Sequence, residues 1–88
     1  MKTGVIYKAT NKITGKSYIG QSSRTLSARI YEHYRDCKKH NYHFARALRK
    51  YKKENWNWCV IVTVPLDNLN EAEKLWIIEL DPINDGYN

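Results

Sequence analysis

The sequence predicts an α+β fold in which two strands, two helices, a third strand and a last helix follow one another (β-β-α-α-β-α). Three observations support this order. Two short segments rich in β-branched and aromatic residues flank a turn near the start of the chain. A stretch free of Gly and Pro then carries apolar residues at helical spacing. A second apolar run ends at Pro65, and an amphipathic segment follows it.

The first two strands are predicted to form a β-hairpin. Residues 4–9 and 16–21 have strand character, and residues 11–15 (Asn-Lys-Ile-Thr-Gly) supply turn chemistry between them. The third strand is predicted over residues 56–64, before Pro65. Because its run Cys59-Val60-Ile61-Val62 is continuously apolar, we expect this strand to be central and covered on both faces.

Three helices account for most of the remaining chain. The first is predicted from Leu26 to about residue 39, after the hydroxyl side chains of residues 22, 23 and 25 that can cap it. Asn41 can cap a second, shorter helix that runs to about residue 51. The last helix is expected to begin near residue 68 or 70 and to reach residue 79 or 80, where Asp81-Pro82 stops it.

Length and charge limit the classes of function. The chain has 88 residues and a mass of 10.4 kDa, which predicts a single domain over residues 1–88. Its net charge of +6 makes nucleic acid the first partner to consider, although a merely soluble surface with excess lysine would look the same. No apolar run reaches the roughly 18 residues that span a bilayer, and the start lacks a signal peptide. We therefore expect no membrane partner and a cytoplasmic location.

Cysteine and histidine spacing gives little support to a structural metal or a disulfide. Cys37 and Cys59 are far apart and form no CxxC pair, so we expect both to be free, buried thiols. His33, His40 and His43 follow an H-x6-H-x2-H pattern that fits no usual zinc spacing.

One face of the first helix gathers polar side chains next to its apolar stripe. At about 100° per residue, Arg29, His33, Asp36 and His40 fall within about 60° of one another. Arg29 and His33 should then lie at the rim of the core, partly shielded from water. The alternative is an amphipathic helix with ordinary solvated charges on its shoulder.

The last helix places Glu73 in the same sector as its apolar stripe. Leu69, Trp76, Ile77 and Leu80 lie within about 60° of this glutamate. Burying an unpaired carboxylate costs several kcal/mol, so Glu73 requires a cation, a hydrogen-bond cluster or a metal. A structural pair with an arginine and a metal-ligand role remain equally open.

Two tyrosines complete a resemblance that covers essentially the whole chain. The segment Gly4-Val5-Ile6-Tyr7, followed by Tyr18-Ile19-Gly20, resembles the paired signature of the GIY-YIG nucleases, with Val5 inserted in the first motif. Arg29, His33 and Glu73 match the family's arginine, its His or Tyr one turn later, and its metal-binding glutamate. The ending Gly86-Tyr87-Asn88 resembles the close of the catalytic domain in phage homing endonucleases. Gln21 replaces the lysine of repair-type members, which favours the homing-endonuclease branch.

The resemblance implies a three-stranded antiparallel sheet flanked by helices, and phosphodiester hydrolysis with one Mg²⁺ or Mn²⁺. It implies that Glu73 holds the metal and that Arg29 stabilises the transition state. Tyr7, with its pKa lowered near the metal and Arg29, would take the proton from the attacking water, and Tyr18 and His33 would orient that water or the phosphate. Of the two histidines that follow, His40 is preferred to His43 because it falls on the Arg29 face. Asn88 completes the set of site residues.

The function expected from the sequence is therefore a metal-dependent DNA endonuclease domain of the homing type. A free-standing restriction or repair nuclease is one alternative, and a basic DNA-binding module without turnover is another. Double-stranded DNA is the expected partner, and a C-terminal DNA-binding domain is expected to be missing, unless the chain is a minimal phage enzyme. The predicted phosphate contacts come from Arg24, Arg35, Lys38, Lys39, Arg46 and Arg49.

Overall fold

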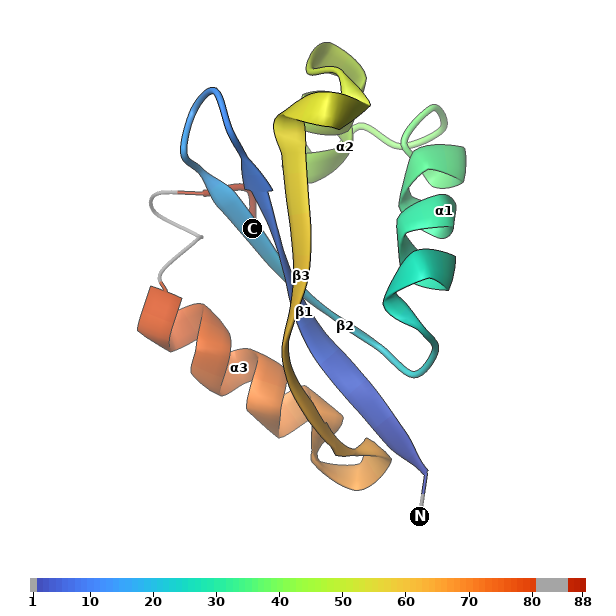
Figure 1. Ribbon diagram of the computed structural model, residues 1–88, viewed down its shortest axis with the longest axis vertical. Helices are drawn as coiled ribbons and strands as arrows, with labels where there is room; N and C mark the ends of the chain where they lie inside the picture. Colours follow the sequence, from blue (N-terminus) through green and yellow to red (C-terminus); the bar gives the residue numbers. More distant parts are fainter. Residues whose placement is uncertain (1, 81–85) are drawn as a thin grey trace.

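The computed structural model describes residues 2–80 and 86–88, and it confirms the predicted element order. The strands are β1 (Thr3–Asn11), β2 (Ser17–Ser22) and β3 (Trp56–Pro65). The helices are α1 (Leu26–Asp36), α2 (His43–Lys50) and α3 (Leu69–Leu80), and two short 3-10 turns, η1 (Lys53–Asn55) and η2 (Leu66–Asn68), flank β3. Figure 1 shows α1 and α2 on one face of the sheet and α3 on the other.

The sheet is antiparallel, with the strand order β2-β1-β3. The prediction that β3 is central is therefore wrong, because β1 is central and β3 is an edge strand. Cys59 and Val60 are exposed on β3, whereas Ile6 and Tyr7, neighbours on β1, are both fully buried. Since successive strand residues point to opposite faces, two adjacent buried residues require that both faces of β1 be covered.

The two faces of the sheet carry separate cores. On the α3 side, Ile6, Ile19 and Leu69 form a cluster to which Trp76 and Ile77 add. On the α1 and α2 side, a larger cluster includes Ala9, Cys37, Phe44, Ala45, Ala47, Leu48, Trp56 and Tyr87. A side chain at Gly4 would meet Leu69 Cδ2 at 2.9 Å and Ser22 O at 2.8 Å, so this glycine lets the start of α3 lie directly against β1.

The helix ends differ from the predicted ones in two places. Thr25 caps α1 as expected, its Oγ1 accepting from Ala28 N at 3.2 Å. However, α1 ends at Asp36 rather than near residue 39. Helix α2 begins after Tyr42 without a side-chain cap, because Asn41 Oδ1 instead accepts from Arg49 Nη2 at 2.9 Å. The predicted stop of α3 at Asp81-Pro82 lies outside the described residues.

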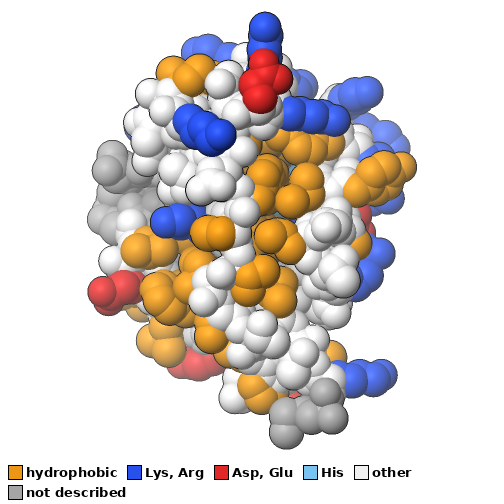
Figure 2. Space-filling model, viewed as in Figure 1, with side chains coloured by type: hydrophobic (Ala, Val, Ile, Leu, Met, Phe, Trp, Pro, Cys, Tyr) orange, Lys and Arg blue, Asp and Glu red, His pale blue; other side chains and the backbone are white. Residues whose placement is uncertain are grey.

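The two cysteines and the charged side chains have different surroundings on the two sides of the sheet. Cys37 is buried as expected, but Cys59 is exposed because it lies on the edge strand. In Figure 2, Lys and Arg gather at the end near α2 and along the α1 side, and acidic side chains appear beside α3. Among the described residues, no helix has the length and apolar character needed to cross a bilayer.

Candidate active site

Tyr7 on β1 and Tyr18 on β2 lie on the same face of the sheet, beneath α1. Tyr7 is paired with Gly20 across the two strands. A side chain at Gly20 would collide with the Tyr7 hydroxyl and would lie 2.9 Å from the Tyr18 ring. The glycine therefore leaves the space over β2 that the Tyr7 ring occupies, and it explains why this sequence needs Gly beside Tyr18 and Ile19.

His33 reaches this tyrosine from α1. The Tyr7 hydroxyl and His33 Nε2 are 2.6 Å apart in a buried hydrogen bond that joins the sheet to the helix. Tyr7 is fully buried and His33 is 3% exposed. The sequence prediction that the helix rim shields His33 from water is thus borne out in geometry, with more burial than a rim position implies.

Burial sets the protonation states of this pair. Desolvation, aided by the nearby Arg29 charge, lowers the pKa of His33 to about 4. Burial also raises the pKa of Tyr7 above its usual range, and this outweighs the lowering effect of Arg29. Arg29 alone therefore does not lower the pKa of Tyr7, and the expected lowering beside a bound metal ion stays a prediction. At neutral pH the pair consists of a protonated phenol and a neutral imidazole.

An aromatic cluster holds these rings in place. The Tyr18 ring stacks on Phe44 of α2, with centroids 4.0 Å apart and planes 1° from parallel. His33 meets Phe44 edge-on at 5.1 Å, and Trp58 of β3 lies 6.1 Å from Tyr7. The sequence analysis missed Phe44 and Trp58 in this role. No spacing rule identifies them, because they lie on two separate elements, α2 and β3, that meet these rings only in the folded chain.

Arg29 lies one turn before His33 on α1 and is half-buried. Its Nη1 is 3.6 Å from Glu32 Oε1, and Glu32 also pairs with Arg24. Arg29 Nε is buried and has no hydrogen-bond partner among the described residues. This guanidinium thus keeps a donor that a phosphate oxygen could satisfy.

Glu73 of α3 approaches the same site from the other side of the sheet. Burial raises the pKa of Glu73, and this outweighs the lowering effects of Gln21 and Arg29. Within residues 2–80 and 86–88, Glu73 forms no salt bridge, and the carboxylate that pairs with Arg29 is Glu32. The structural Arg29–Glu73 pair that the sequence left open does not form in this part of the chain.

Asn88 and the two later histidines have other positions. The Asn88 side chain bonds both the N–H and the C=O of Ile19 at 2.8 Å, so it holds the free edge of β2 next to Tyr18. His40 lies beyond the end of α1 and is exposed, with its ring 5.7 Å from Tyr42. Because α1 ends at Asp36, His40 does not continue the Arg29 face of the helix, and that part of the prediction is wrong. Among the described residues no hydrogen bond or ring contact joins His40 to Tyr7, Tyr18 or His33. His43 packs edge-on to Tyr87 at 5.1 Å.

The predicted phosphate-binding residues are spread over the α1 and α2 side. Five of them have exposed side chains: Arg24, Arg35, Lys38, Lys39 and Arg46. Arg49 is also exposed, but its guanidinium bonds the carbonyls of Cys37 and His40 and thereby ties α2 to the end of α1. Its contact with a phosphate stays a prediction. Sequence reasoning missed Lys52 and Lys53, which follow α2 and continue the same positive surface.

The arrangement can stabilise negative charge and move a proton. Tyr7 and His33 share a short, buried hydrogen bond, and Arg29 supplies a positive charge beside them. Glu73 is the carboxylate of this group without a cationic partner in the described chain, and no cluster of three or more metal-ligating side chains occurs there. Such a site suits one cation that takes its other oxygen ligands from water or substrate.

Comparisons with known proteins agree with this geometry. Residues 3–88 match the sequence model of the GIY-YIG catalytic domain. The catalytic domain of homing endonuclease I-TevI superposes with a TM-score of 0.81 at 26% identity, over 97% of this chain and 96% of that one. A variant of the same domain gives a TM-score of 0.84 at 25% identity, over 98% and 92% of the two chains.

A viral protein is similar in sequence. An uncharacterized protein of Acanthamoeba polyphaga mimivirus is 31% identical to this chain. The alignment is 105 residues long and takes in 98% of this chain. The chain spans 40% of the length of that relative.

Proposed function

Because the chain belongs to the GIY-YIG family of nuclease domains, we propose that it hydrolyses phosphodiester bonds of double-stranded DNA with one Mg²⁺ or Mn²⁺. The observation that carries the proposal is the buried 2.6 Å bond between Tyr7 and His33, with Arg29 beside it. A basic module that only bound DNA would not require a buried phenol and imidazole joined by a hydrogen bond. Such a module would gain the same affinity from its exposed lysines and arginines.

A metal ion fits the residues that are present. Glu73 is half-buried, has a raised pKa and forms no salt bridge in the described chain, so a cation would relieve the cost of its burial. Mg²⁺ commonly takes only one or two protein carboxylates and keeps water and phosphate oxygens as its other ligands. Bound at Glu73, it would act as a Lewis acid toward a phosphate oxygen.

The chain's own residues then account for proton transfer. In the Nδ1–H tautomer of His33, the Tyr7 hydroxyl donates to Nε2. Tyr7 can pass this proton to His33 while it accepts one from the attacking water, so no isolated phenolate forms in the buried site. Arg29 Nε and Nη1 can donate to the phosphoryl oxygens, where negative charge grows in the transition state.

Arg29 must leave Glu32 for this role. The 3.6 Å separation is longer than a good charge-assisted hydrogen bond, so Glu32 holds the guanidinium loosely. Gln21 on β2 bonds Asn70 Oδ1 at 2.7 Å and thereby fixes the start of α3 beside β2, close to Glu73. These contacts orient the charged groups before substrate arrives.

Plasmid cleavage tests the proposal. The chain should convert supercoiled plasmid to nicked or linear DNA in the presence of Mg²⁺ or Mn²⁺, and EDTA should stop the reaction. DNA binding without cleavage under every metal condition would instead support the non-catalytic module.

Glu73→Gln tests the metal-holding role of this carboxylate. The change keeps the shape of the side chain and removes its charge, so cleavage should vanish while the fold persists. Glu71→Gln, two residues earlier on the same helix and exposed, serves as the matched control. Mg²⁺ should raise the melting temperature of the wild type and of Glu71→Gln, but not of Glu73→Gln. An active Glu73→Gln enzyme would contradict the proposed metal site.

A further inference from the structure

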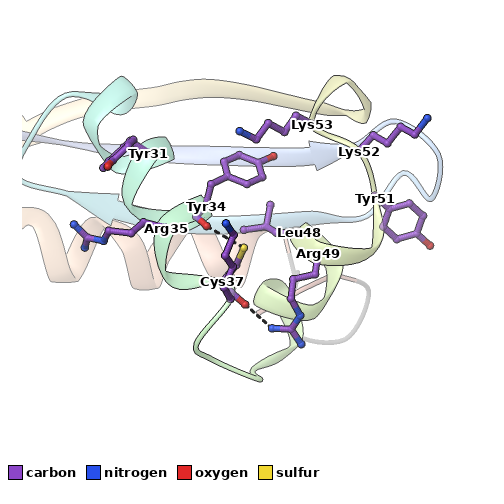
Figure 3. Close-up of a pocket in the computed structure, with 10 residues that line it drawn as sticks. Tyr31, Tyr34, Arg35, Cys37, Leu48, Arg49, Tyr51, Lys52 and Lys53 are labelled. Atoms are coloured by element: carbon purple, nitrogen blue, oxygen red, sulfur yellow. Dashed lines mark hydrogen bonds between the residues drawn. The ribbon is translucent and has the colours of Figure 1, made fainter.

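A hollow lies on the far side of α1 from Arg29, between the end of α1, the end of α2 and η1. It has a volume of about 720 Å³. Tyr34, Cys37 and Leu48 line its inner part, and Figure 3 shows the Tyr34 ring and Leu48 side by side there. None of the catalytic side chains described above lines this hollow. It is large enough for a nucleotide, since ordinary ligand pockets measure about 300 to 1,000 Å³.

The inner surface of the hollow is aromatic and apolar. Tyr34 is half-buried, and Leu48 and Cys37 are buried. Tyr31, one turn before Arg35 on α1, stands at one end with 68% of its surface exposed. Of these side chains, Tyr31 and Tyr34 expose ring surface on which a flat, apolar ring such as a nucleobase can stack, and base stacking does not require a particular sequence.

The rim of the hollow is cationic. Lys53 Nζ lies 4.7 Å from the centre of the Tyr34 ring in a cation–π contact. A base that stacks on this face of Tyr34 has to displace the lysine, which can then contact a phosphate at the rim. Arg35, Lys38 and Lys52 also line the opening, and no Asp or Glu is among the lining residues of the described chain. An occupant therefore needs negative charge at its edge and a flat apolar part within.

We propose that this hollow binds an unpaired nucleotide of the DNA, with the base against Tyr31 and Tyr34 and the phosphates on the lysine and arginine rim. The bases of an intact duplex are stacked on one another and cannot reach the floor, so a fully paired strand would use only the rim. An acidic peptide would match the rim but would supply no obligatory flat ring for the floor. The proposal rests on DNA being the substrate.

The Trp58 side chain lies between Tyr34 of the hollow and the catalytic cluster around Tyr7. The Trp58 ring is 6.3 Å from the Tyr34 ring and 6.1 Å from the Tyr7 ring. A nucleotide held on Tyr34 is thus separated from the catalytic tyrosine by a single aromatic side chain. The domain should therefore bind best where an unpaired segment adjoins a duplex.

Fluorescence anisotropy in EDTA tests this binding preference. The probes are a short duplex and the same duplex with a single-stranded thymidine tail. The wild type should bind the tailed DNA about tenfold more tightly, within the range that stacking of one base on an aromatic side chain provides. Tyr31→Ala and Lys53→Glu should remove the preference. Tyr31→Phe, which keeps the ring, and Lys2→Glu, which makes the same charge change at the start of the chain, should retain it.

Cross-linking gives an independent readout. A 5-iodouracil base in the tail should cross-link on irradiation to Tyr31 or Tyr34, and mass spectrometry would locate the bond. Equal wild-type affinity for the two DNAs, or cross-links confined to other residues, would overturn the proposal. The proposal would also be overturned if poly-glutamate displaced the tailed DNA as effectively as a thymidine oligonucleotide does. A wild type that prefers the tail but never cleaves DNA with Mg²⁺ would refute the proposed function and leave the hollow's role intact.

Discussion

Acid should weaken this fold through His33, over a pH range that the structure defines. Burial and Arg29 lower the pKa of His33 to about 4, from an ordinary value of 6.5 that the unfolded chain should show. Between these two values the unfolded state binds more protons than the folded state, so stability falls as pH falls. The full difference corresponds to about 3 kcal/mol, of which about 2 kcal/mol should be lost between pH 7 and pH 4.5.

Urea unfolding followed by tryptophan fluorescence can measure this loss. Carboxylates also titrate in this range, so the informative quantity is the difference between the wild type and His33→Gln at each pH. The wild type should lose about 2 kcal/mol more than the variant on going from pH 7 to pH 4.5, a shift of about 1 to 2 M in the urea midpoint. His40→Gln replaces an exposed histidine and should keep the wild-type slope. If His33→Gln and the wild type lose stability in parallel, His33 is not held neutral in the fold, and the proton transfer from Tyr7 loses its acceptor.

Three further predictions concern the site and its surface. Arg29→Ala should fold and bind DNA but cleave it about a hundredfold more slowly in single turnover, and Tyr7→Phe should behave similarly, because both side chains act on the transition state. If both variants cleave at the wild-type rate and melt at lower temperatures, the two residues are structural. Gly20→Ala should lower the melting temperature and the cleavage rate together, because its methyl group meets the Tyr7 hydroxyl; an unchanged melting curve would contradict that contact. DNA affinity should fall steeply with salt, as expected for exposed residues such as Arg46, and a flat salt titration would remove the phosphate contacts.

The strand order shows where sequence patterns lose information about a fold. Continuous apolar runs occur at residues 5–7 and 59–62, and both satisfy the pattern of a strand covered on two faces. Only β1 is covered in this way, because it pairs with a strand on each side and lies between α1 and α3. The register shift between Ile6 and Tyr7 leaves Ile61 between two paired positions of β3. Periodicity within one segment cannot report such tertiary neighbours.

The position of a site residue was predictable where it follows from rotation within one helix. It was not predictable where it depends on the residue at which that helix ends. Arg29 and His33 lie four residues apart within α1, so their shared face follows from helical rotation alone. His40 was placed on the same face by extending the helix past Asp36, but the turn after Asp36 redirects the chain. Arg49 stabilises that turn by bonding the carbonyls of Cys37 and His40. The interaction links positions nine and twelve residues apart, beyond the reach of a helical repeat.

The strongest link between fold and proposed chemistry is the way charge is distributed around Arg29. Glu32, one turn along the same helix, pairs with both Arg24 and Arg29, and so offsets repulsion between these two neighbouring cations. Glu73, from the opposite face of the sheet, has a raised pKa and no cation paired with it in the described chain. A partly buried glutamate that served only to stabilise the fold would be expected to have a cationic or hydrogen-bonding partner, because leaving a buried carboxylate uncompensated is costly. Arg29 pairs with Glu32 in the described chain and not with Glu73, which is the arrangement expected if Glu73 holds a metal ion as proposed.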